Sequence, residues 1–169
     1  MENLNNLGDL HGKTVVITGG TSGVGRAAAE AFALECCNVV VGARGQEGLD
    51  ETVSLCHDLG VVALGVPTDV SKFEDVENLA NLALQYNGRI DIWVNNVGVM
   101  ASGKFEDVPV ESMDQLVKTN LLGYLHGEHA VIPIFKKQKD GILINNVSIG
   151  GYVPAPYSTA YSSTKFGIR

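Results

Sequence analysis

The residues best suited to proton transfer lie near the end of the chain, in the sequence AYSSTKFGIR at positions 160–169. Tyr161 and Lys165 are four residues apart, so in a helix their side chains would lie on one face, one turn from each other. A free phenol has a pKa of about 10, and a neighbouring ammonium group lowers this value because it favours the phenolate. The pair is therefore either an acid–base device or an exposed pair on a helix surface.

A glycine-rich segment, TGGTSGVG at positions 18–25, lies between an apolar run and an Ala-rich run. Glycines in such a turn let backbone N–H groups approach a pyrophosphate, and a helix N-terminus adds positive potential. The position after an expected strand and before an expected helix favours dinucleotide binding over a merely tight loop. The residues expected to bind the cofactor here are Gly19, Thr21, Ser22, Gly23, Val24 and Gly25.

The end of the second apolar run, VVVGARGQ at positions 39–46, indicates which dinucleotide binds. Dinucleotide folds usually carry an acid about 20 residues after the glycines to hold the ribose hydroxyl of NAD, or an Arg to hold the 2′-phosphate of NADP. Ala43 stands where the acid is expected and Arg44 follows it. A guanidinium group pairs with phosphate through two parallel hydrogen bonds, so we predict NADP (NADPH) over NAD. The alternative is that Arg44 is an ordinary exposed loop residue.

Short apolar runs alternate with longer amphipathic ones along the whole chain. The apolar runs predicted as buried parallel strands are 14–18, 38–42, 61–66, 90–96 and 141–148, and the predicted helices are 24–35, 47–59, 71–86, about 110–137 and one starting near Ser158. This order predicts an α/β fold, a doubly wound (Rossmann) parallel sheet in three layers, with five strands in the order 3-2-1-4-5. Ser71 and Glu74 read as a capping box, and Gly123 and Gly127 could allow close helix packing. In the helix over 71–86, an apolar stripe is formed by Phe73, Val76, Leu79, Ala80 and Ala83.

The 169 residues are 45% hydrophobic and 18% charged, a composition typical of one soluble globular domain. The formal net charge is −7 and the sequence has no Lys/Arg-rich run, so we expect no nucleic-acid partner. The sequence also lacks an apolar run of ~20 residues, a signal-peptide pattern and a zinc-type cysteine spacing. We therefore expect a cytoplasmic protein with reduced thiols, no membrane span and no metal site. Residues 1–10 are expected to be a loose leader, and residues 11–169 a single NAD(P)-binding domain.

Taken together, these segments resemble the short-chain dehydrogenase/reductase (SDR) family, from about Lys13 to the end of the chain. TGGTSGVG corresponds to the family's TGxxxGxG cofactor loop, and NNVG at 95–98 to its NNAG motif. KTNLLG corresponds to the segment that carries the family's active-site Asn, VSIGG contains Ser148, and YSSTK contains Tyr161 and Lys165. The 13-residue spacing of Ser148 and Tyr161 is also that of the family. Each motif alone is modest, whereas all five in this order are highly specific.

The resemblance implies a catalytic tetrad of Asn120, Ser148, Tyr161 and Lys165. Tyr161 is then the acid in carbonyl reduction and the base in alcohol oxidation, and Lys165 lowers its pKa and binds the nicotinamide ribose. Ser148 orients the substrate oxygen, and Asn120 holds a water in a proton relay behind the lysine. Tyr157 competes with Tyr161 for the acid role, but the residue four positions after Tyr157 is not basic.

The resemblance also implies cofactor contacts on the adenine side from Asp69, Val70, Asn96 and Gly98. The residues themselves leave two alternatives open. Asp69 could cap the following helix instead. Asn95 and Asn96 end a buried strand, where amide groups need partners, so a structural role is at least as well supported as a ligand contact.

SDR proteins are longer than this chain, so the resemblance implies a C-terminally incomplete domain. The first function it allows is an NADP(H)-dependent oxidoreductase for a small-molecule carbonyl or secondary alcohol, a homodimer or homotetramer in its full-length form. The second is a truncated NADP(H)-binding module with weak or no turnover. The third is a sugar-nucleotide epimerase or dehydratase of the related extended class, which is disfavoured because that class spaces its loop TGxxGxxG.

Overall fold

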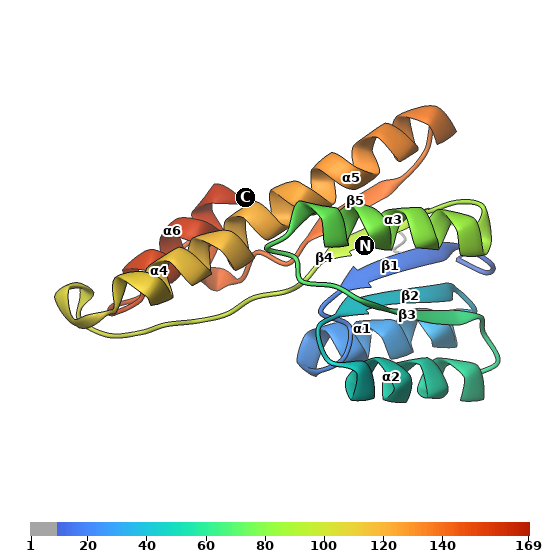
Figure 1. Ribbon diagram of the computed structural model, residues 1–169, viewed down its shortest axis with the longest axis horizontal. Helices are drawn as coiled ribbons and strands as arrows, with labels where there is room; N and C mark the ends of the chain where they lie inside the picture. The colour runs from blue at the N-terminus through green and yellow to red at the C-terminus, as the bar shows by residue number, and fades with distance from the viewer. Residues whose placement is uncertain (1–9) are drawn as a thin grey trace, which may run out of the picture.

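The computed structural model describes residues 10–169 and contains a five-stranded sheet in the order β3-β2-β1-β4-β5 (Figure 1). All four neighbouring pairs are parallel. The strands are β1 (Thr14–Thr18), β2 (Asn38–Ala43), β3 (Ala63–Pro67), β4 (Ile92–Asn95) and β5 (Ile142–Asn145). The predicted doubly wound class and the predicted strand order are both confirmed.

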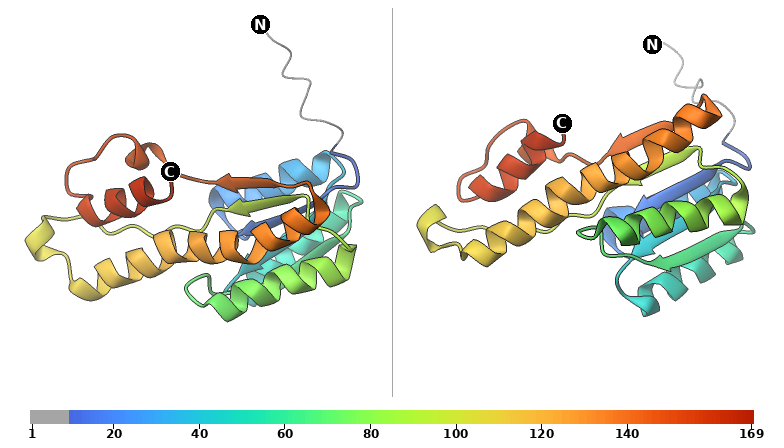
Figure 2. Two further views of the ribbon diagram at one scale, coloured as in Figure 1. Left: turned by 90° about the horizontal axis from the view of Figure 1, so that it is seen from above. Right: turned by 45° about the horizontal axis from the view of Figure 1, so that its top comes forward.

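Helices cover both faces of this sheet and give the domain three layers (Figures 1 and 2). The α-helices are α1 (Gly23–Leu34), α2 (Gln46–Asp58), α3 (Phe73–Asn87), α4 (Val110–Leu116), α5 (Gly123–Gln138) and α6 (Thr159–Gly167), and the short turns are η2 (Phe105–Asp107), η3 (Val117–Leu122) and η4 (Ile149–Gly151). α1 and α2 pack on one face, and α3 and α5 on the other. α4 and α6 lie beyond the carboxyl ends of the strands (Figure 2).

Alternation of side chains along β1 explains the two hydrophobic cores. Val15 and Ile17 are fully buried on the face covered by α1 and α2, whereas Val16 is buried on the face covered by α3 and α5. Fully burying one such side chain contributes about 1.5–3 kcal/mol. A strand in a sheet covered on both faces must therefore be apolar at nearly every position, which is the pattern its sequence shows.

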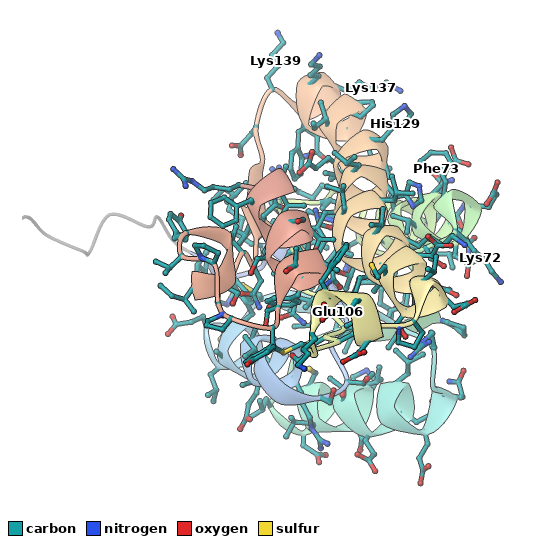
Figure 3. All side chains as sticks on the ribbon, turned by 90° about the vertical axis from the view of Figure 1, so that its left-hand side faces the viewer. Lys72, Phe73, Glu106, His129, Lys137 and Lys139 are labelled. Carbon is teal, nitrogen blue, oxygen red and sulfur yellow. The ribbon has the colours of Figure 1, made fainter. Side chains whose placement is uncertain are left out.

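Contacts between α3 and α5 close one of these faces. The residues of the predicted stripe that are buried are Val76, Leu79, Ala80 and Ala83. Phe73 is half-buried at the start of α3, and its ring is edge-on to His126, with ring centroids 5.8 Å apart, and to His129, at 5.1 Å (Figure 3). The stripe predicted from the sequence is therefore the surface that α3 turns toward the sheet and α5.

Two glycines let α5 approach the sheet closely. A Cβ atom at Gly123 would lie 2.8 Å from Cγ2 of Val70, and one at Gly127 would collide with the side chain of Asn95. The close approach expected at these two glycines is present, but it is made to Val70 and to β4 rather than to another helix. It brings the first turns of α5 against the loop after β3 and the end of β4.

The predicted helix from Val110 to Lys137 forms one continuous helical run, α4–η3–α5, that contains Pro133. Its middle part, η3, is a π-helical turn that the sequence analysis did not predict. Such turns are rare and are frequent at functional sites. This one contains Asn120, which is fully buried.

The capping box predicted for Ser71 and Glu74 is wrong. Helix α3 begins at Phe73, later than a Ser71 cap requires. The Ser71 hydroxyl donates to Oδ1 of Asp69 at 2.8 Å, while Oδ2 of Asp75 accepts from the Asp69 N–H at 2.9 Å. Lys72 therefore holds the N-cap position, and the Ser71 hydroxyl serves the turn that precedes the helix.

Three strands are shorter than predicted, and the last of them borders an exposed face. β5 ends at Asn145, and its apolar residues Ile142 and Ile144 are 46% and 40% exposed. The predicted strands 61–66 and 90–96 are shortened to 63–67 and 92–95.

The N-terminal leader expected over residues 1–10 falls outside the described residues except for Leu10. Leu10 packs against the core on the side of α1. Within residues 10–169, each helix is either too short or too polar to span a lipid bilayer.

Candidate active site

Two adjoining clefts open at the carboxyl end of the sheet, with volumes of about 250 Å³ and about 390 Å³. They share a wall made of Gly19 and Ser22 after β1 and of Val97 and Val99 after β4. Because the lining is shared, the two clefts form one groove that crosses the end of β1. Ligands of open α/β sheets bind at this edge, where the strand order reverses.

The groove gathers most of the predicted site residues. Those lining the first cleft are Gly19, Thr21, Ser22, Arg44, Asp69 and Val70. Those lining the second are Gly19, Ser22, Val24, Asn96, Gly98, Ser148, Tyr161 and Lys165. Gly23, Gly25 and Asn120 lie outside the lining of both clefts. Lining residues that the sequence analysis missed include Thr68, Gln115 and Thr119 in the first cleft and Met100 and Asn146 in the second.

The glycine-rich loop owes its shape to positions where only glycine fits. Gly19 has φ +70° and Gly23 has φ +50°, a left-handed conformation that side chains disfavour. A Cβ atom at Gly25 would collide with the carbonyl oxygen of Gly19 and with Nδ2 of Asn96. Gly23 and Gly25 therefore determine the shape of the loop and of the start of α1 without lining the groove themselves. The N-terminal end of α1 lies at the groove and contributes a positive potential there.

Arg44 and Asp69 follow β2 and β3 and lie together in the first cleft. Burial acts to raise the pKa of Asp69, yet this pKa lies below its ordinary value, because Ser71 donates two hydrogen bonds to the carboxylate and Lys72 and Arg44 attract its charge. Asp69 thus fixes the turn that enters α3 and lines the cleft as well. The two roles left open for it are compatible.

Val70 beside them is held by α5. The ring nitrogen Nδ1 of His126 lies 2.9 Å from the carbonyl oxygen of Val70. A carbonyl group only accepts hydrogen bonds, so this nitrogen carries the proton. The wall of the first cleft is thereby tied to the helical run that contains Asn120.

Ser148 and Tyr161 both lie close to Gly150 and line the second cleft. A Cβ atom at Gly150 would lie 3.0 Å from Cε1 of Tyr161 and 3.8 Å from Oγ of Ser148. The Ser148 hydroxyl oxygen accepts from the Gly150 N–H at 3.3 Å. Ser148 itself has φ 74° and ψ 157°, a conformation essentially confined to glycine that costs a side-chain-bearing residue about 1–3 kcal/mol. Such strain is frequent at functional sites, and here it directs the hydroxyl into the second cleft.

Tyr157, the competing tyrosine, lies elsewhere. Its side chain is 64% exposed, and its carbonyl oxygen accepts from the N–H of Gly103 at 2.9 Å. It lies outside the lining of both clefts. Among the two tyrosines, only Tyr161 is placed to meet a ligand in the groove.

Lys165 is buried, with 3% of its surface exposed, although its ammonium group reaches the second cleft. Nζ donates to the carbonyl oxygen of Asn146 at 2.9 Å and to the hydroxyl of Tyr124 at 3.1 Å. It also lies 4.7 Å from the centre of the Tyr124 ring. Burial lowers the pKa of Lys165 to about 8. The sequence analysis paired this lysine with Tyr161 alone and missed Tyr124 and Asn146.

Asn120 uses its side chain to join two walls of the site. Oδ1 accepts from the N–H of Val99 and Nδ2 donates to the carbonyl oxygen of Val99, both at 2.8 Å. Nδ2 also lies 3.4 Å from Oγ1 of Thr164, on the helix that carries Tyr161 and Lys165. Asn120 therefore connects the groove wall at Val99 to α6.

Asn95 and Asn96 have the structural partners that their buried position demands. Oδ1 of Asn95 accepts from Nε1 of Trp93 at 2.8 Å, and its Nδ2 donates to the carbonyl oxygen of Tyr124 at 3.2 Å. Nδ2 of Asn96 donates to the carbonyl oxygen of Gly19 at 3.2 Å. Asn95 therefore anchors α5 to the sheet, whereas Asn96 both braces the glycine-rich loop and lines the second cleft.

Comparison with known proteins agrees with this geometry. Residues 13–169, nearly the whole chain, match the short chain dehydrogenase family model. The chain belongs to the short-chain dehydrogenase/reductase family. The resemblance seen in the sequence motifs is thus confirmed for the SDR family as a whole.

Curated relatives of this SDR chain include two bacterial oxidoreductases. It is 37% identical over 162 residues to 3beta-hydroxysteroid dehydrogenase 1 of Eggerthella lenta, an alignment that covers 95% of this chain and 62% of that protein. It is 35% identical over 161 residues to an uncharacterized oxidoreductase of Staphylococcus haemolyticus, with 95% and 68% covered.

Two solved SDR-type structures superpose on most of the fold. A short chain dehydrogenase/reductase from Burkholderia phymatum in complex with NAD has a TM-score of 0.92 and 31% identity, covering 95% of this chain and 57% of that one. An alcohol dehydrogenase from the archaeon Thermococcus sibiricus, complexed with 5-hydroxy-NADP, has a TM-score of 0.88 and 30% identity, covering 92% and 66%. This SDR chain thus spans 57% to 68% of the length of these four proteins.

Proposed function

We propose that this protein is an NADP(H)-dependent oxidoreductase that interconverts a small-molecule carbonyl and a secondary alcohol by hydride transfer. The observation that carries the proposal is that Ser148, Tyr161 and Lys165 line one cleft, which continues into the groove along the glycine-rich loop. A phenol, a hydroxyl group and a buried cation beside a dinucleotide-type groove are the groups that carbonyl reduction requires of a protein.

The proton and the substrate oxygen are handled by the side chains of the second cleft. A bound nicotinamide supplies the hydride in reduction and accepts it in oxidation. Tyr161 gives its phenolic proton to the carbonyl oxygen in reduction and takes it back in oxidation. The oxygen of Ser148 already accepts a bond from the Gly150 N–H, so its own hydrogen is available to orient the substrate oxygen.

Lys165 provides the charge that makes Tyr161 a usable acid and base. A cation in the same cleft stabilises the negative charge that the Tyr161 oxygen carries after it has given up its proton. Because the pKa of Lys165 is about 8, the ammonium form still predominates at pH 7. Lys165 also reaches the cleft far enough to meet the ribose hydroxyls of a bound cofactor.

Asn120 supports this chemistry by positioning other groups. Its amide is engaged with both backbone groups of Val99 and with Thr164, so it fixes the groove wall relative to α6. We therefore assign the side chain of Asn120 a positioning role. If an ordered water belongs to the proton relay, we expect the main-chain carbonyl group of Asn120 to bind it.

Arg44 is the feature that favours NADP(H) over NAD(H). It lines the first cleft together with Asp69, whose carboxylate is already engaged with Ser71. An exposed guanidinium at this place can pair with a 2′-phosphate. The solved relatives were complexed with NAD in one case and with 5-hydroxy-NADP in the other, so the preference rests on Arg44 itself.

A binding module without turnover is the second candidate function. It is favoured by the exposure of Ile142 and Ile144 on the sheet edge, at 46% and 40%. In that case the groove would bind NADP(H) without reducing a carbonyl.

We further propose that the full-length form assembles as a homodimer or homotetramer through the helical run and α6. Exposed apolar side chains on these elements are Val117, Leu122, Leu125, Ile132 and Phe166. Burying them against a second copy would remove apolar surface from water. Sedimentation equilibrium tests this proposal, and a strictly monomeric protein at high concentration contradicts it.

Consumption of NADPH by the purified protein, followed with a panel of ketones and aldehydes, tests the main proposal. We expect turnover in the wild type, at least 100-fold less (order of magnitude) in Tyr161→Phe, and unchanged NADPH binding in that variant. Tyr157→Phe is the matched control, since it removes the same hydroxyl from a tyrosine outside the groove. NADPH binding with no turnover of any carbonyl supports the binding module, and normal turnover by Tyr161→Phe refutes the assignment of the acid.

A further inference from the structure

A second tyrosine, Tyr124, lies directly beneath the lysine of the candidate site. It belongs to the first turn of α5 and is 1% exposed. Its hydroxyl accepts from Nζ of Lys165 at 3.1 Å and donates to the carbonyl oxygen of Asn146, also at 3.1 Å. Nζ of Lys165 donates to that same carbonyl at 2.9 Å, so the three groups form a closed triangle of hydrogen bonds.

The triangle determines where the remaining N–H group of the lysine points. An ammonium group has three donors and no acceptor. Two of these donors are used by Tyr124 and Asn146, on the buried side of the lysine. The third is left for the second cleft, where Tyr161 and the ribose of a cofactor would lie.

Tyr124 is itself fixed in place, so it can serve as a rigid support. Its carbonyl oxygen accepts from Nδ2 of Asn95 at 3.2 Å, which ties the first turn of α5 to the end of β4. Gly127 in the next turn lets the helix lie directly against Asn95. The Tyr124 ring, 4.7 Å from the ammonium, also presents its negative face to the cation.

We infer that Tyr124 is a positioning residue for Lys165, which holds the ammonium charged and aims its free N–H into the cleft. The inference rests on the function proposed above, in which Lys165 serves Tyr161 and the cofactor. Tyr124 itself lies behind the lysine and is separate from the reacting atoms. Its effect on the rate therefore passes through Lys165.

Tyr124 contributes the side-chain hydrogen bond to the ammonium group, beside the main-chain bond from Asn146. The titratable groups that face it are Tyr124 on α5 and Tyr161 on α6. The loop after β5 contributes the neutral carbonyl group of Asn146. Gly98 also borders the ammonium group, since a Cβ atom there would lie 3.7 Å from Nζ. The pKa of Tyr124 is raised by burial and by Tyr161, so its hydroxyl stays neutral and able to accept.

Tyr124→Phe tests the inference, because it keeps the ring and removes only the hydroxyl. The titration of Lys165 is followed by NMR of the protein with isotopically labelled lysine, the signal being identified by its absence in Lys165→Met. We expect the midpoint to fall by about one pH unit in Tyr124→Phe, since a neutral acceptor that favoured the charged form is gone. Tyr86→Phe is the matched control, because the Tyr86 hydroxyl also donates to a backbone carbonyl, that of Ala63, at 3.4 Å.

In an active enzyme we also expect kcat for carbonyl reduction to fall by about 10-fold and the alkaline limb of the pH profile to move to lower pH. If Tyr124→Phe does not fold, Tyr124→Met supplies a similar apolar volume without the hydroxyl. An unchanged Lys165 midpoint, or unchanged kcat and pH profile in an active enzyme, overturns the inference. A shifted midpoint in a protein that turns over no carbonyl supports the positioning by Tyr124 and counts against the proposed function alone.

Discussion

Nζ of Lys165 lies 2.9 Å from the main-chain carbonyl oxygen of Asn146, which joins a helix beyond the sheet to the residue that follows β5. Nδ2 of Asn146 donates to Oδ1 of Asn96 at 2.9 Å, and Nδ2 of Asn96 donates to the carbonyl oxygen of Gly19 at 3.2 Å. A chain of hydrogen bonds therefore runs from the proposed catalytic lysine to the glycine-rich loop. These bonds fix the position of Lys165 relative to the glycine-rich loop.

Replacing the middle member of this chain should loosen both ends. Asn96→Ala removes three hydrogen bonds, to Thr18, Gly19 and Asn146. At a net value of about 0.5–1.5 kcal/mol each, we expect the free energy of unfolding to fall by about 1.5–4.5 kcal/mol. Urea denaturation measures this loss, and NADPH titration should show weaker binding. Asn81→Ala, at an exposed position of α3, is the control and should change neither value.

Gly25→Ala should damage cofactor binding through the backbone. The added methyl group would meet the carbonyl oxygen of Gly19 and Nδ2 of Asn96, so the loop or the start of α1 must move. Overpacking of this kind typically costs about 1–3 kcal/mol. We expect that loss in denaturation and a loss of NADPH affinity in fluorescence titration. At Gly98 the nearest atom to such a methyl group is 3.7 Å away, so Gly98→Ala should keep its stability; an equal loss there would contradict the steric explanation.

Arg44→Asp should reverse the preference between the two nicotinamide cofactors. It exchanges a cation that can pair with a 2′-phosphate for an anion that repels it, while a carboxylate suits the ribose hydroxyls of NADH. We expect the ratio of the Kd values for NADPH and NADH to change by about 10-fold or more. Lys104→Asp makes the same change of charge at an exposed position outside both clefts and is the control. An unchanged ratio in Arg44→Asp would mean that Arg44 is an ordinary surface arginine.

Much of the scaffold follows from local patterns. β1 and β2 are near-continuous runs of Val and Ile because helices cover both faces of the sheet there, and glycines occupy the turn after β1. The long helix was predicted, but its π-helical turn was not, because a π turn differs from an α turn by one residue of hydrogen-bond register. That difference leaves little trace in apolar periodicity.

The site could be predicted where its residues stand in motifs, and not where tertiary packing brings them together. In the sequence, Tyr124 is one more aromatic residue on the buried side of a helix. Only the close approach of α5 to the sheet at Gly127 places it beneath Lys165. Asn146 acts through its main-chain carbonyl, which carries no sequence signal. The capping box failed because the turn after β3 places Lys72, and not Ser71, directly before the first residue of α3. Only the side chain of Asn146 had a sequence signal, since the Asn pair 145–146 at the end of β5 matches the pair 95–96 at the end of β4.

The burial of Lys165 should make stability depend on pH in a way that one variant isolates. Its pKa is lowered from 10.5 in the unfolded chain to about 8 in the fold, because burial disfavours the charged form. Between these two values the unfolded state binds more protons than the folded state, so this group makes stability rise with pH. Below about pH 8 the buried ammonium weakens the fold in full, and above about pH 10.5 it no longer does.

Lys165→Met removes this dependence while it keeps a long apolar side chain in the same space. We expect the free energy of unfolding of the wild type, relative to that of the variant, to increase by roughly 3 kcal/mol as the pH rises from 7.5 to 10.5. This value follows from the size of the pKa shift of Lys165. Urea denaturation of both proteins at several pH values measures the difference, in which the titration of other groups cancels. The same variant should lose carbonyl reduction while it remains folded. A stability difference that stays flat or falls with pH would mean that Lys165 is solvated as an ordinary surface lysine, and its role as a buried cation beside Tyr161 would then lose its physical basis.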